Sequence, residues 1–408
     1  MSLVTSLFIV GFIIIVGLIS QYIFKKFKIP DVLILMVFGA LLSYFNLANT
    51  IKQGSTELTF LITFSLIYVV FYGALPIKLK AIFSTMKYAL LSSLLNFIVI
   101  TALLGSISYL FGFGWLLGLS LGALFCVLDG SIINSLLGIL KISPKAEAQI
   151  QTESAIIDVL VIVGVLSFIN FARIGLNQVL QNLTSYLFLS FAIGLVVAFV
   201  WSFTLKHVGN YSSAPVATMA VLVMLYAFGE YVGANGVITV FCFSIILGNV
   251  ALLSKLFYKR QKESLSVMDM ATKSFFKEIS FLIRTFLFVY LGLLVDFTMW
   301  PYLLLGLMFF VIAYLLRSFI SKHVYNESLT HRELYFIDAM CAKGLTPTVM
   351  LAVIGGTAAF TNTVVGGIFS SVLITSILIF LVERGKFTTV SNMIVERIKH
   401  SRHKRRYG

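Results

Sequence analysis

Long apolar stretches dominate this chain and constrain its fold more than any other feature. Thirteen can be marked in the 408 residues, most of them near the roughly 20 residues that a helix needs to cross a bilayer. Only 11 % of the residues are charged, whereas a soluble domain carries about 25 %. The stretches cover residues 3–24, 31–46, 57–76, 86–111, 113–140, 148–171, 182–204, 214–231, 234–253, 275–297, 302–322, 332–356 and 363–384. We therefore expect an all-α protein with thirteen transmembrane helices in a cell membrane, the plasma membrane of a prokaryote.

The distribution of lysine and arginine predicts the orientation of these helices. Lys52 and Arg173 alone lie in loops after even-numbered stretches, and Arg284, Arg317 and Lys343 lie inside stretches. The other basic residues lie in loops after odd-numbered stretches, at the ends of stretches that adjoin these loops, or in the tail; among them are Lys25, Lys26, Lys28, Lys78, Lys80, Lys141, Lys145 and Lys206. Because cytoplasmic loops carry the excess of basic residues, the N-terminus is expected outside and the C-terminus in the cytoplasm.

The net charge of +14 is explained by this topology and gives no indication of nucleic-acid binding. The tail KHSRHKRRYG is expected to act as a topology anchor, or to lie near anionic lipid. Three cysteines, Cys126, Cys242 and Cys341, lie in apolar stretches without metal-ligand spacing. No GxxxxGK[ST] phosphate loop occurs, so we expect no cofactor and no nucleotide-driven step.

Two pairs of segments resemble each other at an offset near 215–219. VFYGALPIK (70–78) is similar to VYLGLLVDF (289–297), and FCVLDGS (125–131) is similar to MCAKGLT (340–346). Seven stretches separate the equivalent segments, so the copies would be inverted in the membrane. Inverted repeats with broken helices at matching positions are typical of secondary transporters, whose site lies near the midplane. Asp129 suits the positive N-terminus of a half-helix, and Lys343 suits the carbonyl groups freed at the other break.

Two acids in QTESAIIDVLVIV (151–163) are candidates for the site. Hard alkali cations prefer oxygen ligands, which Asp158, Ser154, Thr152 and the backbone of 127–130, with the Leu128 carbonyl and Asp129, can supply. Burial disfavours the ionised carboxylate, so Na⁺ or Li⁺ and H⁺ would compete for Asp158. That competition gives coupled exchange if access alternates between the two sides.

The other intramembrane charges are expected to pair with one another. The depth of Glu153 favours Arg317 as its structural partner, with Arg284 as the alternative. Arg284 could instead be satisfied by Glu278, six residues earlier. Asp338 is expected to pair with Lys343 or to line a cytoplasmic funnel, and Glu230 to cap a helix end. The histidines at 207, 323, 331, 400 and 403 are expected in solvated positions at cytoplasmic helix ends or in the tail, and those at 207, 323 and 331 could sense cytoplasmic pH.

The segment LDGSIINSLLGILKISPKAEAQIQTESAIIDVLVIV (128–163) resembles the core of the monovalent cation:proton antiporters, the sodium/proton exchangers. In that family a Thr-Asp-Pro break precedes a Glu-Ser-Leu-Leu-Asn-Asp motif on the next helix. The likeness is closest to the electroneutral prokaryotic and archaeal branch. Further matching segments are FGEYVGANGVITVFCFSIILGN (228–249), RTFLFVYLGLLV (284–295) and KGLTPTVMLAV (343–353).

The resemblance implies a role for each matching residue. Asp158 would bind the cation and the proton in alternation, Ser154 would help to line the cation site, and Glu153 would pair with a core arginine. Leu128-Asp129-Gly130 stands at the first break and Lys343-Gly344 at the second. Two departures are Ile157 in place of the motif asparagine and Leu128 in place of the threonine, so the family's stoichiometry and ion selectivity are not carried over.

The resemblance also implies a moving core, a fixed scaffold, a homodimer formed through the scaffold and a role in pH homeostasis. Residues 1–111 would hold scaffold helices 1–3 and core helix 4, 112–171 core helices 5–6, 172–204 linker helix 7, 205–297 scaffold helices 8–10, 298–386 core helices 11–13 and 387–408 the basic tail.

Two other readings compete with a Na⁺ or Li⁺ antiporter. One is a K⁺/H⁺ antiporter or a passive cation channel of the same superfamily; the short sequence after the last stretch argues against nucleotide-gated efflux. The other is an intramembrane aspartyl protease built on Asp158 and Asp129, which lacks the expected GxGD sequence. We therefore expect a secondary transporter and no enzyme.

Overall fold

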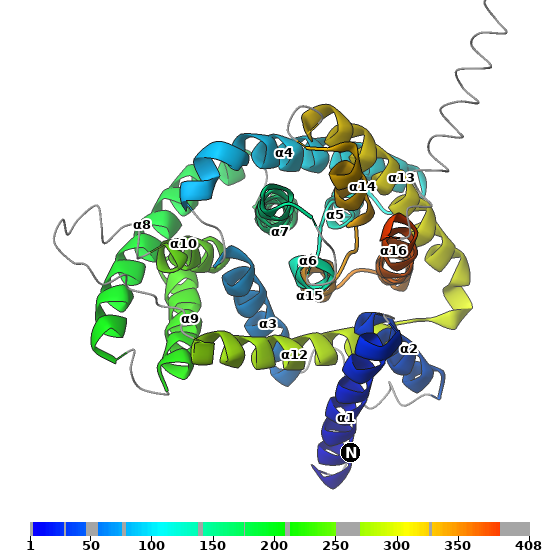
Figure 1. The fold of residues 1–408 in the computed structure, drawn as a ribbon, viewed down its shortest axis with the longest axis horizontal. Coiled ribbons are helices and arrows are strands. Elements are labelled where there is room, and N and C mark those ends of the chain that lie inside the picture. The colour runs from blue at the N-terminus through cyan, green and yellow to red at the C-terminus, as the bar shows by residue number, and fades with distance from the viewer. Residues whose placement is uncertain are drawn as a thin grey trace, which may run out of the picture.

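The structure, a computed structural model, is entirely helical over the residues that it describes. These are residues 3–27, 30–45, 56–75, 79–137, 142–174, 176–208, 213–249, 270–325 and 329–383, and no strand occurs among them. Between its two ends, a helix satisfies its backbone hydrogen bonds within itself, as a segment that crosses lipid requires. The helices, shown in Figure 1, are α1 (Leu3–Phe27), α2 (Asp31–Tyr44), α3 (Thr56–Ala74), α4 (Leu79–Leu110), α5 (Trp115–Leu124), α6 (Gly130–Leu137), α7 (Pro144–Ile174), α8 (Leu176–Val208), α9 (Ala214–Tyr231), α10 (Gly236–Gly248), α12 (Met270–Leu293), the 3₁₀ turn η2 (Phe297–Met299), α13 (Trp300–Tyr325), α14 (His331–Ala339), α15 (Leu345–Ile354) and α16 (Ala358–Glu383).

Every stretch expected from hydropathy contains helix. Within the described residues, six helical segments are both long and apolar enough to cross a membrane. They are Lys87–Leu110, Pro144–Ile169, Phe188–Leu205, Ala214–Tyr231, Phe297–Tyr325 and Ala358–Phe380. Shorter apolar helices, α2 and α10 among them, accompany these six. The all-helical membrane architecture is confirmed, while the number of thirteen spans and their orientation stay predictions.

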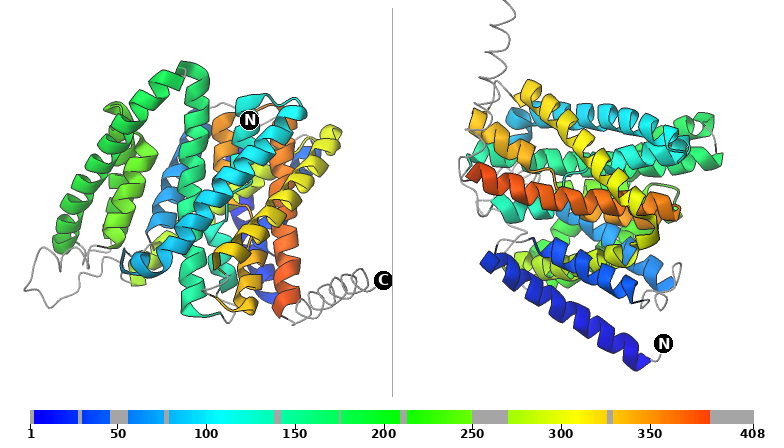
Figure 2. Two further views of the ribbon diagram at one scale, coloured as in Figure 1. Left: turned by 90° about the horizontal axis from the view of Figure 1, so that it is seen from above. Right: turned by 90° about the vertical axis from the view of Figure 1, so that its right-hand side faces the viewer.

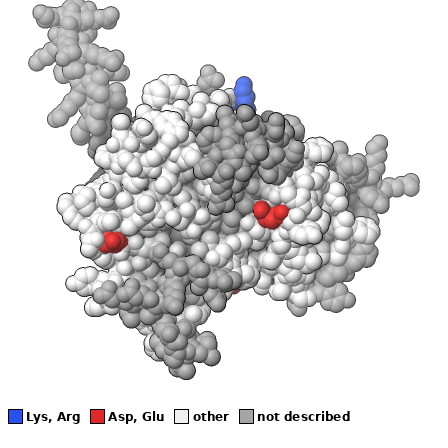
Figure 3. Space-filling view, turned by 180° about the vertical axis from the view of Figure 1, so that it is seen from behind, with Lys and Arg blue, Asp and Glu red and all other residues white. Residues whose placement is uncertain are grey.

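The outer surface is largely uncharged, as lipid contact requires. Among the described residues of the face shown in Figure 3, few side chains are charged. Large apolar side chains are exposed on several helices, including Phe8 on α1, Leu110 on α4 and Phe188 on α8. In water such a surface would cause aggregation, but in a bilayer it meets hydrocarbon.

The helices pack into two groups. In one, α4 packs against α5 and α7, and α13 packs against α16 and α4; in the other, α2 packs against α12, and α10 against α3 and α9. Figure 1 shows α4 and α13 along one edge, α12 along the opposite edge, and α6 and α15 between them. Figure 2 shows the long helices lying side by side, with α1 at the edge of the bundle. α8 joins the groups in sequence and packs against both α7 and α10.

Glycine allows the second group to pack closely. Gly39 of α2 and Gly292 of α12 face each other closely. A Cβ on Gly39 would overlap the carbonyl oxygen of Val289 in α12, and a Cβ on Gly292 would overlap the carbonyl oxygen of Met36 in α2. Two backbones at this separation leave no room for side chains, so α2 and α12 form one tightly joined pair.

Two apolar stretches are each divided into a pair of short helices, as expected. The first is interrupted between Leu124 and Gly130 and the second between Ala339 and Leu345. The two interruptions meet, because the backbone N–H of Asp129 donates to the carbonyl oxygen of Ala342 at 2.9 Å. Residues more than 200 positions apart therefore form one junction in the middle of the bundle, where α6 and α15 lie (Figure 1).

Candidate ion-binding site

Asp129 lies at the junction and caps two half-helices at once. Its Oδ1 accepts a hydrogen bond from the backbone N–H of Ile132 in α6 at 2.8 Å. Its Oδ2 accepts one from the backbone N–H of Leu345 in α15 at 2.6 Å. Each helix N-terminus carries roughly half a positive charge, so the two together offset about one carboxylate. The sequence predicted that Asp129 caps α6; it did not predict that the same carboxylate also caps α15, a helix in the second half of the chain.

Lys343 makes the reciprocal contact. Its Nζ donates to the carbonyl oxygen of Val127 at 2.7 Å, within the interruption that follows α5. Its backbone N–H donates to Ser371 Oγ on α16 at 2.8 Å. The ammonium group therefore lies at carbonyls freed by a broken helix, as expected, where the partial charge is negative.

One face of α7 points toward this junction. A helix turns by about 100° per residue, so Gln151, Ser154 and Asp158 lie in one stripe, with Ala155 beside them. Ser154 Oγ donates to the carbonyl oxygen of Leu128 at 2.9 Å, which ties α7 to the first interruption. Thr152, six residues before Asp158, lies about 120° away around the helix.

This stripe lines a cavity of about 50 Å³. One water needs roughly 10–15 Å³ of such space, so the cavity can hold several waters or a partly hydrated ion. The first interruption and α6, α7 and α15 contribute Asp129, Gly130, Gln151, Ser154, Ala155, Asp158, Leu345 and Thr346. The opposite wall is formed by Tyr68, Val69, Tyr72 and Gly73 of α3 and Ser280 of α12. The cavity therefore lies between the two groups of helices.

Asp158 differs from the other buried carboxylates around it. Its Oδ1 is shielded from the surface and has no hydrogen-bond partner among the described residues. Thr346 and Asp129 line the same cavity as Asp158. Since Asp129 is balanced by helix N-termini and Lys343 by freed carbonyls, the charge of Asp158 has no dedicated partner there. Two carboxylates facing one cavity repel each other when both are ionised, which favours a bound cation or proton.

The donor set of the cavity suits an alkali cation. Asp158 offers a carboxylate, and Ser154 and Thr346 offer hydroxyl oxygens. Over the described part of the chain, no group of three or more His, Cys, Asp or Glu side chains converges. Hydroxyl and carboxylate oxygens are the ligands that hard cations prefer.

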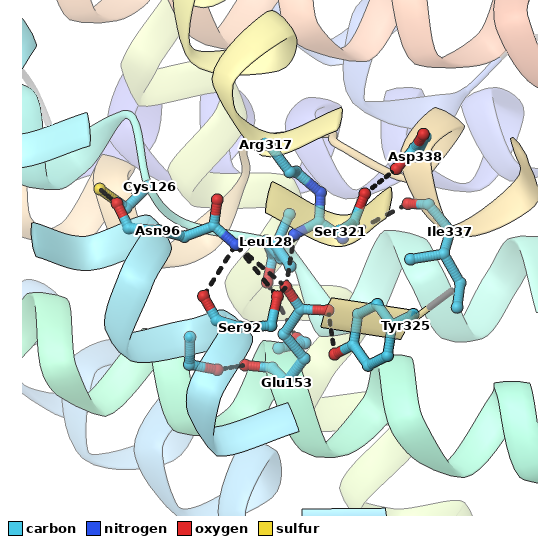
Figure 4. Close-up of polar contacts among 12 residues, drawn as sticks. Ser92, Asn96, Cys126, Leu128, Glu153, Arg317, Ser321, Tyr325, Ile337 and Asp338 are labelled. Carbon is cyan, nitrogen blue, oxygen red and sulfur yellow. Dashed lines mark hydrogen bonds and ion pairs between the residues drawn. The ribbon is translucent and has the colours of Figure 1, made fainter. Parts of the chain in front are cut away.

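Glu153 forms a separate cluster behind the cavity, shown in Figure 4. Arg317 Nη1 lies 2.6 Å from Glu153 Oε1, and both side chains are buried. Ser92 Oγ donates to the same oxygen at 2.9 Å, and the Tyr325 hydroxyl donates to Glu153 Oε2 at 3.0 Å. Arg317 Nη2 also donates to the carbonyl oxygen of Ile337 on α14 at 3.3 Å. The structure thus brings together the pair expected from depth and joins α4, α7, α13 and α14 around it.

Arg284, the alternative partner, lies elsewhere. Its Nη1 is 3.7 Å from Asp31 Oδ2, at the start of α2. Glu278, expected as its other partner, is exposed. Six residues on a helix correspond to a rotation of about 240°, so Glu278 and Arg284 point in different directions. The expected Glu278–Arg284 contact is therefore wrong.

Asp338 does not pair with Lys343, against our expectation. Its Oδ2 accepts a hydrogen bond from Ser318 Oγ at 2.9 Å, and its Oδ1 accepts one from Ser321 Oγ. Asp338 is in the last turn of α14, before the interruption, and faces α13, whereas the Lys343 ammonium reaches across to Val127. The two serines satisfy the carboxylate locally.

Four further features of the sequence can be located in the structure. Thr152 donates to the carbonyl oxygen of Ala148 at 2.7 Å and is absent from the described lining of the cavity. Glu230 caps the turn after α9, where its Oε1 accepts from the N–H of Gly236 at 2.7 Å. Ile157 is buried in the apolar core. His323 is exposed, while the other four histidine side chains lie outside the described residues.

Sequence reasoning missed the wall of the cavity that α3 and α12 form, as well as Thr346 and Gln151. A helical projection through Asp158 would have found Gln151 and rejected Thr152. The tyrosines of α3 and Ser280 carried no such signal, because only tertiary packing brings them opposite Asp158.

The comparisons with known proteins agree with this geometry. The family described as "Sodium/hydrogen exchanger, transmembrane" matches residues 11–384. The probable Na(+)/H(+) antiporter 2 of Methanocaldococcus jannaschii is 22 % identical over 293 residues, which cover 68 % of this chain and 66 % of the relative, just under two thirds of its length.

The fold is also similar to solved structures. The structure of the sodium proton antiporter MjNhaP1 from Methanocaldococcus jannaschii at pH 8 has a TM-score of 0.73, with 18 % identity, over 93 % of this chain and 96 % of that one. An electron-microscopy structure of the same antiporter has a TM-score of 0.72, also with 18 % identity, over 96 % and 98 %. At this identity the likeness shows the fold.

Proposed function

Because the chain belongs to the sodium/hydrogen exchanger family, we propose that it exchanges a monovalent cation for H⁺ across a membrane, with Na⁺ and Li⁺ preferred. The observation that carries the proposal is Asp158, whose buried Oδ1 lacks a partner while its side chain lines a cavity of oxygen donors. Neighbouring charges have their own partners, so Asp158 is the group free to bind and release a charge.

The chemistry of exchange follows from competition for this one carboxylate. A cation needs the ionised carboxylate and neighbouring oxygens such as that of Ser154, whereas a proton neutralises the carboxylate itself. Only one of them occupies Asp158 at a time, so each crossing carries either the cation or the proton. The cation gradient then drives proton movement without nucleotide energy.

In this proposal, one group of helices moves against the other, and this movement opens the site to each side of the membrane in turn. The core would comprise α4–α7 and α13–α16, and the scaffold α1–α3, α9, α10 and α12, with α8 as the linker. The position of the cavity between the two groups supports this division. Thirteen spans in an inverted repeat, an external N-terminus and a homodimer formed through the scaffold belong to the same proposal.

The test is exchange in proteoliposomes. Pulses of NaCl, LiCl or KCl should move protons, with Na⁺ and Li⁺ most effective, and a lower pH should raise the cation concentration needed. Asp158→Asn should reduce proton movement to that of protein-free liposomes, because the amide binds neither ion by charge. The matched control is Asp296→Asn, which alters a carboxylate that caps the η2 turn through Thr298 at 2.9 Å.

Two outcomes would contradict the proposal. Full exchange by folded Asp158→Asn would remove its basis. A cation current without proton counterflow would instead favour a channel, and stronger coupling to K⁺ than to Na⁺ would favour a K⁺/H⁺ antiporter.

A further inference from the structure

Thr346 lies at the cavity on the second broken helix. It is in the first turn of α15, its side chain is 3 % exposed, and it lines the cavity that Asp158 faces. The preceding residue is fixed in place, because the N–H of Leu345 donates to Asp129 Oδ2 at 2.6 Å. The position of Thr346 is therefore set by the junction itself.

The oxygens around Asp158 are not equally available to an ion. Both oxygens of Asp129 accept from helix N-termini, and the Leu128 carbonyl accepts from Ser154. On the opposite wall, the Tyr68 hydroxyl donates to the carbonyl oxygen of Phe276. The side chain at the first interruption, Leu128, is an alkyl group and offers no oxygen.

Thr346 and Asp158 line the same cavity, one from α15 and the other from α7. A hydroxyl has one hydrogen and two lone pairs, so it can serve each state of the carboxylate. In the empty site it can donate to the ionised carboxylate. With a cation present it can rotate, so that its lone pairs face the ion and its hydrogen turns away.

We infer that Thr346 is a direct cation ligand and determines part of the cation affinity, an inference that rests on the proposed function. The ion would then be held by Asp158 and Ser154 from α7 and by Thr346 from α15. Ligands would thus come from both halves of the chain, and Thr346 would supply the side-chain oxygen that Leu128 does not.

Substitutions in proteoliposomes test the inference. Thr346→Val removes the hydroxyl and keeps the shape, so the KM for Na⁺ and for Li⁺ should rise at least about tenfold, with little change in kcat at saturating cation. Thr346→Ser keeps the hydroxyl and should have nearly the wild-type KM. The matched control is Thr348→Val in the same helix, since Thr348 is equally buried and its hydroxyl donates to the carbonyl oxygen of Gly344 at 2.7 Å. Its KM should not change.

The outcomes separate this inference from the proposed function. Absence of cation-driven proton movement in the wild type would overturn the function. Exchange in the wild type with an unchanged KM in Thr346→Val would overturn the inference alone. So would a fall in kcat without a change in KM, or a serine variant that behaves like the valine variant.

If Thr346→Val does not fold, Thr346→Cys decides the question. It keeps the size of the side chain but replaces the oxygen with sulfur, which hard cations bind poorly. The stabilisation of the purified protein by LiCl against thermal unfolding should then shift to higher LiCl concentrations. An unchanged LiCl dependence would overturn the inference.

Discussion

Glu153 accepts hydrogen bonds from several side chains although none of its own surface is exposed. Arg317, Ser92 and Tyr325 surround its two oxygens, and Asn96 approaches one of them at 3.5 Å. A buried ion pair contributes little against an apolar pair of the same shape, but removing one partner leaves the other charge uncompensated. This cluster is therefore sensitive to the loss of a single charge.

Glu153→Gln should lower the free energy of unfolding by about 3–5 kcal/mol, because Arg317 would stay buried without a carboxylate. Chemical unfolding of the purified protein in detergent measures this change. Tyr325→Phe, which removes one hydrogen bond to the same carboxylate and no charge, is the control and should cost about 1.5–3 kcal/mol. A glutamine variant as stable as the wild type would show that the pair does not hold the helices together.

Sequence reasoning at the residue scale succeeded where depth alone decided the partner. Glu153 and Arg317 lie at one depth on two long helices, so their contact could be predicted. Asp338 and Arg284 were assigned to charges near them in sequence, and there the prediction was wrong. Asp338 instead accepts from Ser318 and Ser321, and Arg284 lies beside Asp31. These contacts depend on helix rotation and on packing between distant segments, which the sequence pattern does not contain.

At the scale of elements, the N-termini of α6 and α15 are both capped by the carboxylate of Asp129. Gly344 leaves the space that this carboxylate occupies. A Cβ at Gly344 would overlap Asp129 Oδ2, the atom that accepts from the N–H of Leu345. Because the junction holds both half-helices, any displacement of Asp129 is transmitted to α6 as well as to α15.

Gly344→Ala should therefore destabilise the protein by about 0.5–2 kcal/mol for each cap that is lost and should abolish exchange. Thermal unfolding and the proteoliposome assay measure the two effects. Gly11→Ala in α1 is the control, because its Cβ would meet nothing within 4 Å, and it should be neutral or slightly stabilising. Normal exchange in Gly344→Ala would mean that the junction tolerates a displaced Asp129.

Most elements could be predicted from hydropathy, since each apolar stretch must be helical in lipid. Both interruptions could also be located, because a charge beside glycine in a long apolar stretch has no other good explanation. Their joining through Asp129 and Leu345 could not, as it depends on how two helix ends, 216 residues apart, approach in space.

At the scale of the whole molecule, the proposed core and scaffold meet beside the cavity. Ala74 at the end of α3 and Ala155 of α7 are both buried and pack against each other. Ala155 also lines the cavity. The contact between the two alanines therefore lies at the boundary between the proposed core and scaffold, which would have to move for access to alternate. If the core moves against the scaffold, the two alanines separate during each cycle.

A disulfide between Ala74→Cys and Ala155→Cys, with Cys126, Cys242 and Cys341 replaced, should stop exchange when oxidised and restore it when reduced. The bond would fix the core to the scaffold in the arrangement seen here. The control is Thr101→Cys with Cys126 retained, since Thr101 Oγ1 and Cys126 Sγ lie 3.5 Å apart within the core. Oxidation of that pair should leave exchange unchanged, because both residues move together. Undiminished exchange by the fully cross-linked 74–155 variant would rule out movement at this boundary, and the cation and proton would then have to reach Asp158 by opening of the core alone.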